Sequence, residues 1–77
     1  MLHQGQDRFN RLARDWCLRP YYYWLVLKYN GHRFKIIAIE PENRRNPIVL
    51  KDLDNSQTLL CPVAFVLNLI DEQFRSR

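Results

Sequence analysis

Aromatic and cationic side chains alternate along two neighbouring segments of this chain. Trp24 and Lys28 belong to the first segment, and Arg33 and Lys35 belong to the second. Single-stranded nucleic acids are held by bases that stack on exposed rings and by cations that follow the phosphates. If both segments are strands, this pattern predicts a surface that binds nucleic acid, single-stranded or RNA. The candidate binding residues, for nucleic acid or another partner, are Tyr22, Trp24, Lys28, Arg33, Lys35, Arg44 and Arg45.

An Asn30-Gly31 pair between the two segments predicts the turn that would position them. Both residues accept the positive φ angles of a two-residue type I′ turn, so residues 21–29 and 32–40 are expected to form a hairpin. Side chains alternate between the faces of a strand, and this turn therefore fixes both faces. One face pairs Tyr29 with His32, Leu27 with Phe34, Leu25 with Ile36 and Tyr23 with Ala38. The other pairs Lys28 with Arg33, Val26 with Lys35, Trp24 with Ile37 and Tyr22 with Ile39.

The second face is open to two interpretations. If it is exposed, the like-charged pair of Lys28 and Arg33 favours an anionic ligand, because such a pair is otherwise mildly destabilising. If a helix or a second copy covers it, its apolar residues are ordinary core. The competing hypothesis is a protein-interaction module, such as a homodimer, an adaptor or an inhibitor, that uses the surface of Tyr22, Trp24, Ile37 and Ile39.

The segment from Pro41 to Pro47 carries two adjacent arginines, Arg44 and Arg45. Its prolines fit neither a ladder nor a helix, so the segment is expected to be a loop. The planar guanidinium fork suits phosphate or carboxylate. Arg44 and Arg45 are therefore candidates for contact with an anionic partner, provided that the loop borders the cationic face.

Nothing in the sequence indicates an enzyme, a metal site or a cofactor. The only glycines are Gly5 and Gly31, which excludes a glycine-rich phosphate loop. Cys17 and Cys61 lack the spacing of a zinc site, and the two histidines, at positions 3 and 32, are scattered. We expect no catalytic residue, no bound metal and no small-molecule cofactor, and we expect both cysteines to be reduced and buried.

The remaining segments predict the elements around the hairpin. Apolar residues at helical spacing indicate an amphipathic helix from Asp7 to about Leu18, with Asp7 at its N-cap or first turn. Residues 48–53 predict a third strand and residues 57–61 a short fourth strand. The segment after Pro62 matches both a helical stripe and a strand face, and its length to Phe74 favours a helix. The expected fold class is α+β: an N-terminal helix, an antiparallel meander of three to four strands and a C-terminal helix.

Composition limits the class of protein. The 77 residues are expected to form one small globular domain, residues 1–77, whose net charge is +4. Residues 1–45 hold nine Lys and Arg against four Asp and Glu, so the positive charge lies in the first helix and the hairpin. No apolar run approaches the roughly 20 residues that cross a bilayer. We expect no membrane contact and a cytoplasmic location.

The order of elements in residues 7–53 resembles that of the Sm-like RNA-binding barrels. The likeness consists of a helix, a strand, Asn-Gly, a second strand, a loop and a third strand that ends in Ile48-Val49-Leu50-Lys51. It implies an alternative fold, a small SH3/Sm-like β-barrel with an N-terminal helix, and RNA as the partner. The sequence departs from that family because Phe34, Ile36 and Ala38 occupy the strand where a glycine is expected.

Overall fold

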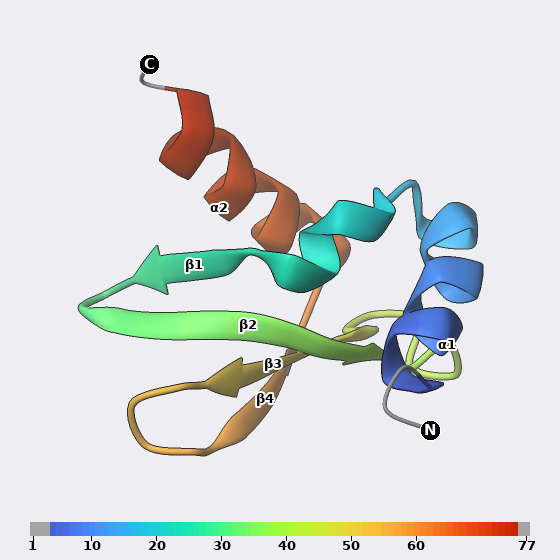
Figure 1. Ribbon diagram of the computed structural model, residues 1–77, viewed down its shortest axis with the longest axis horizontal. Helices are drawn as coiled ribbons and strands as arrows, with labels where there is room; N and C mark the ends of the chain where they lie inside the picture. Colours follow the sequence, from blue (N-terminus) through green and yellow to red (C-terminus); the bar gives the residue numbers. More distant parts are fainter. Residues whose placement is uncertain (1–3, 76–77) are drawn as a thin grey trace.

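In the computed structural model, which describes residues 4–75, two α-helices flank a four-stranded antiparallel sheet (Figure 1). The elements in chain order are α1 (Gln4–Ala13), two short 3-10 helices η1 (Arg14–Trp16) and η2 (Pro20–Trp24), β1 (Val26–Tyr29), β2 (His32–Ile39), β3 (Ile48–Asp52), β4 (Thr58–Cys61) and α2 (Val63–Arg75). The strands lie in the order β1-β2-β3-β4, as in a simple meander. The expected α+β fold is confirmed.

The first helix ends earlier than its apolar spacing predicts. Phe9 and Ala13 are buried as expected, but α1 stops at Ala13 and the chain tightens into η1. Cys17 then takes a left-handed conformation, with φ at 59°, and the N–H of Leu18 donates to the carbonyl of Ala13 at 2.9 Å. This reversal leaves Cys17 exposed. The expectation of two buried thiols is therefore wrong for Cys17 and confirmed for Cys61.

The Asn-Gly turn forms as predicted. Asn30 has φ of 56° and Gly31 has φ of 81°, the two positive values that a type I′ turn requires. Its register is the expected one for the four pairs nearest the turn, which are Tyr29 with His32, Lys28 with Arg33, Leu27 with Phe34 and Val26 with Lys35. The turn therefore sets which side chains of β1 share a face with those of β2.

The first hairpin strand is shorter than predicted, because residues 20–24 form η2. Pro20 occupies the start of this helix, where its fixed φ is favourable and its missing N–H costs nothing. The ring of Tyr23 packs against Phe9 of α1, with ring centroids 5.3 Å apart. The predicted pairs of Leu25, Tyr23, Trp24 and Tyr22 with β2 are consequently wrong.

A β-bulge in β2 changes which side chains face the core. The register with β3 shifts between Ile36 and Ala38, so Ile37 has no partner in β3. One extra residue exchanges the faces of everything that follows. Ile39, expected on the outer face, is therefore only 1% exposed. The sheet is open and not closed, so the barrel alternative is wrong.

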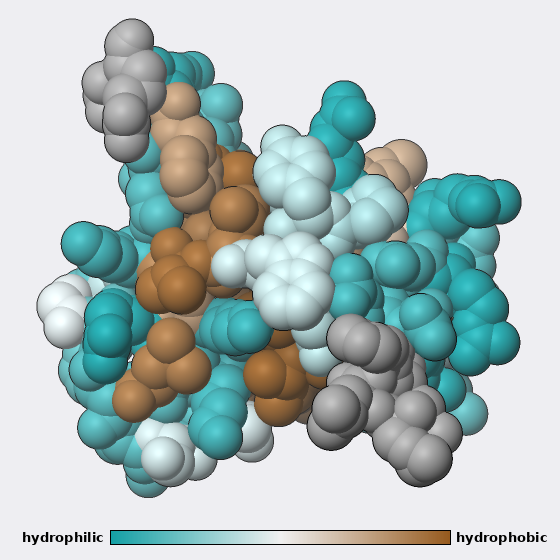
Figure 2. Space-filling view, viewed as in Figure 1, coloured by the Kyte–Doolittle hydropathy of each residue, from teal (hydrophilic) through white to brown (hydrophobic). Residues whose placement is uncertain are grey.

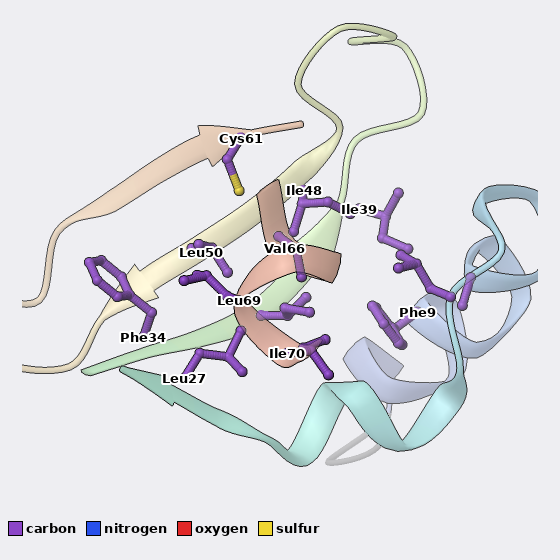
Figure 3. Packing of buried hydrophobic residues seen from close by; sticks show 13 residues of the cluster. Phe9, Leu27, Phe34, Ile39, Ile48, Leu50, Cys61, Val66, Leu69 and Ile70 are labelled. Carbon is purple, nitrogen blue, oxygen red and sulfur yellow. The ribbon is translucent and has the colours of Figure 1, made fainter. Parts of the chain in front are cut away.

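The core lies on one face of the sheet, under α2. Figure 3 shows Val66, Leu69 and Ile70 of this helix against side chains from the strands. The buried strand residues are Leu27, Phe34, Ile36, Ile39, Ile48, Leu50 and Cys61, and Phe9 of α1 lies at the end of the sheet beside Ile39. The C-terminal segment is a helix, as its length predicts, and the N–H of Val66 donates to the carbonyl of Pro62 at 3.4 Å.

Candidate nucleic-acid interface

The face of the sheet opposite α2 has no buried residue among its side chains. We call it the open sheet face; it consists of Val26, Lys28, Arg33, Lys35, Ala38, Val49, Lys51, Thr58 and Leu60, each exposed or half-buried. Strand residues of the other face are mostly buried, because α2 covers them. The helix thus leaves one side of the sheet available for contact.

Two like-charged pairs lie across the strands of the open sheet face. Lys28 is paired with Arg33 and Lys35 with Lys51 in the register of the sheet. Such pairs are unfavourable on their own account, and the open sheet face carries no carboxylate. Lys28, Lys35 and Lys51 form no salt bridge within residues 4–75. The three lysines therefore concentrate positive charge that the described part of the chain does not neutralise.

Arg33 differs from the three lysines, because a carboxylate already holds it. Its Nη2 and Nε lie 3.0 and 3.3 Å from Oδ1 of Asp54, and its backbone N–H donates to Oδ2 of the same residue at 2.9 Å. These bonds lower the pKa of Asp54, the backbone bond most and the guanidinium bond next. Arg33 therefore orders the 53–57 turn, and an anion would have to compete with Asp54 for it.

Trp24 reaches the open sheet face from η2 and not from a strand. Trp24 is 56% exposed, and Nζ of Lys35 lies 5.4 Å from the centroid of its ring. The same Nζ lies 5.7 Å from the ring of Tyr23, so two rings hold one lysine by cation–π attraction. The pairing of Trp24 with Ile37 was wrong, yet the structure still brings its ring beside a cation.

The other residues predicted to share a surface with Trp24 do not lie together. Tyr22 is half-buried, and its ring packs edge-on against that of Tyr21 at 5.0 Å. Ile37 is half-buried in the bulge and Ile39 belongs to the core. The surface of Tyr22, Trp24, Ile37 and Ile39 proposed for a protein partner is therefore not assembled.

Arg44 and Arg45 are exposed in the predicted loop, far from the lysine pair. With Glu40, Glu42, Asn43 and Leu60 they line a shallow concavity of about 570 Å³. The loop joins β3 at Ile48, whereas Lys51 lies near the other end of that strand. The arginines therefore border β4, and the structure does not join them to Lys35 and Lys51.

Three possible metal ligands meet at the hairpin, which the sequence analysis did not anticipate. One ligand atom from each of His32, Asp52 and Asp54 lies within 4.8 Å of the others. Their contacts explain the cluster without an ion: Nδ1 of His32 is 2.8 Å from Oδ2 of Asp52, whose Oδ1 accepts the N–H of Asp54 at 2.9 Å. Asp54 is in turn bonded to Arg33. His3 lies outside the described residues.

An apolar groove of about 220 Å³ lies away from the cations, between η2 and α2, and is lined by Tyr21, Leu25, Ile70 and Phe74. Figure 2 shows apolar side chains gathered over α2 and β1, with paler aromatic groups beside them. Within residues 4–75 no helix combines the length and the apolar character needed to cross a bilayer.

Fold and site together define an α+β protein with a one-sided core and a cationic open sheet. Comparisons with protein-family models, with curated proteins and with solved structures each returned no match. Lys51 is the member of the site that the sequence analysis missed. Alternation along residues 48–53 already contained the signal, since Lys51 and Val49 share a face.

Proposed function

We propose that this protein is a non-enzymatic module that binds single-stranded nucleic acid through the open sheet face and Trp24. The observation that carries the proposal is the charge of this face: it holds Lys28, Lys35 and Lys51 without salt bridges among the described residues, and no carboxylate. A phosphate backbone supplies the anions that these lysines lack. Trp24, which is 56% exposed, supplies a stacking platform.

Each group has a distinct role in the proposed complex. Lys35 and Lys51 are cross-strand neighbours, so one phosphate can approach both ammonium groups. A base adjacent to that phosphate stacks on Trp24, which already lies against Lys35. The stacking ring comes from η2, because the strands carry no aromatic side chain on the open sheet face. Duplexes bind more weakly because their bases are already stacked. The cytoplasmic location remains a prediction.

Binding measured against salt tests the proposal. Fluorescein-labelled oligouridine and oligothymidine are titrated by anisotropy at several salt concentrations, with a duplex of equal length for comparison. The slope of log affinity against log salt is about −0.7 per phosphate contact for single strands. Lys51→Gln should flatten the slope by about one contact, and Trp24→Ala should weaken binding about tenfold with the slope unchanged.

Arg75→Gln is the matched control, because it also removes one positive charge but lies on α2, away from the open sheet face. This variant should keep the wild-type slope. No binding at low salt would refute the proposal, and so would an equal effect of Lys51→Gln and Arg75→Gln.

A further inference from the structure

The two edges of the sheet are treated differently by the fold. At the β1 edge, the N–H of Lys28 donates to Oε1 of Gln73 at 2.7 Å, and Nε2 of Gln73 donates to the carbonyl of Val26 at 2.8 Å. One side-chain amide thus occupies one outward backbone group on each of two residues of β1. An incoming strand cannot pair with these two groups without displacing the Gln73 side chain.

The β4 edge has no such protection within the described residues. The N–H of Asp52 donates to the carbonyl of Gln57 at 2.7 Å, which makes these two residues a hydrogen-bonded pair. Hydrogen-bonded and non-bonded pairs alternate along an antiparallel ladder. Leu59 therefore bonds back to β3, whereas Thr58 and Leu60 direct their N–H and C=O groups away from the sheet.

The side chains of β4 also suit pairing. Leu59 is 40% exposed and Leu60 is 47% exposed, one on each face of the strand. Charges, prolines and bulges are among the features that blunt natural edge strands. The four residues of β4, Thr-Leu-Leu-Cys, contain none of these. An open edge of this kind is a template for another strand.

We propose that β4 pairs with β4 of a second copy of this chain, antiparallel about a two-fold axis through Leu59. In this register Thr58 of each copy is hydrogen-bonded to Leu60 of the other, and Leu59 faces Leu59. Moving the axis to Leu60 sets Thr58 against Pro62, which has no N–H. Moving it to Thr58 sets Leu60 against Ser56, which has φ of 64° and lies outside the strand. Of these three registers, only the one through Leu59 provides hydrogen-bond partners for the outward N–H and C=O groups of both Thr58 and Leu60.

The charges near β4 agree with this arrangement. Arg44 and Arg45 border Leu60, at the end of β4 that leads to Pro62. The two-fold axis places this end opposite the 53–57 turn of the other copy, which carries Asp54. The two arginine pairs therefore lie apart from each other, and the carboxylate of this turn is already bonded to Arg33 of its own copy. A C2 dimer of this kind is the most common form of symmetric assembly, and it joins the two open sheet faces into one surface.

Sedimentation equilibrium of the full chain tests the dimer. We expect the mass to rise with concentration from 9.4 kDa to twice that value. Leu60→Pro removes an outward N–H but no hydrogen bond to β3, and should weaken association about tenfold, whereas Leu60→Thr, which also replaces the side chain but keeps that N–H, should not. Leu59→Arg, which places two charges on the axis, should abolish it. Circular dichroism verifies that each variant is folded. A wild-type protein that stays monomeric up to millimolar concentration overturns the proposal.

Disulfide crosslinking tests the register. In a Cys17→Ser background, Leu59→Cys should form a dimer on oxidation, because facing residues of a non-bonded pair lie within disulfide range. Thr58→Cys is the matched control and should not crosslink, since position 58 faces position 60 of the other copy. Equal crosslinking of the two variants, or none by Leu59→Cys, overturns the proposed register.

Discussion

Gln73 bridges the C-terminal helix to the edge of the sheet, with its Nε2 2.8 Å from the carbonyl oxygen of Val26, a residue 47 positions earlier in the chain. Its Oε1 completes the contact by accepting the N–H of Lys28. The amide therefore does for β1 what a neighbouring strand would do. It fixes α2 along β1 and keeps that edge from pairing with another chain.

Replacing Gln73 by alanine should destabilise the protein and expose the β1 edge. Two hydrogen bonds of about 1 kcal/mol each are lost, so we expect the free energy of unfolding to fall by about 1–2 kcal/mol. Urea denaturation followed by circular dichroism measures this change. Glu72→Ala is the control, since Glu72 is exposed on the same helix. Equal losses in the two variants would contradict the role given to Gln73.

The local part of the fold could be predicted from sequence. Asn30 and Gly31 specify their turn through backbone geometry alone, and the turn carries the register to the four pairs nearest to it. The strand prediction from sequence fails at residues 20–24, where contacts with α1 favour a different structure. Residues 20–24 have a strand-like composition, but Pro20 and the contact of Tyr23 with Phe9 favour a 3-10 helix. Pro20 is the sequence feature that indicates the start of this helix.

The candidate site was predictable in part. Lys28 and Lys35 share a face as the register predicts, whereas Trp24 reaches Lys35 from η2 and not from a strand. Lys51 follows from alternation along β3. The bulge at Ile37 has no local sequence signal, because Ile37 and its neighbours are compatible with a regular strand. It moved Ile39 into the core. The contact between Gln73 and β1 depends on how α2 packs, which no short-range pattern encodes.

Acid should weaken the protein partly through Asp54. The backbone N–H and the guanidinium of Arg33 lower the pKa of this carboxyl below its ordinary value of 3.8. The unfolded chain therefore binds the proton more tightly than the folded one. The contribution is complete above pH 3.8 and is lost as the pH falls through the lower pKa of the folded state. Unfolding free energies of the wild type and Asp54→Asn, measured by urea between pH 2 and 7, should converge at acid pH.

A double-mutant cycle tests whether Arg33 is the residue that makes stability depend on the ionisation of Asp54. In an Arg33→Gln background the guanidinium bond is absent, so Asp54→Asn should change the pH dependence less than it does in the wild type. The backbone bond from residue 33 remains, and a residual difference is expected. An undiminished difference would show that Arg33 does not hold the carboxylate in solution.

The two cysteines should react at very different rates. Cys17 is exposed, whereas burial raises the pKa of the Cys61 thiol to about 11. A disulfide reagent added at pH 8 should therefore modify Cys17 rapidly and Cys61 only when the protein unfolds, because the thiolate is the reactive form. Mass spectrometry after timed labelling measures both rates. In Cys17→Ser the fast phase should vanish, and its persistence would contradict the burial of Cys61.

Replacing Cys17 by glycine should stabilise the protein. Cys17 has φ of 59°, a left-handed conformation in which a side chain with a Cβ is strained and glycine is not. Glycine is also the residue most often found in this position after a helix. We expect a gain of about 0.5–1 kcal/mol, which corresponds to a rise in Tm of about 3–8 °C for a domain of this size. Cys17→Ala is the control, because it removes the thiol but keeps the Cβ. An equal rise in both variants would assign the gain to loss of the thiol and not to backbone strain.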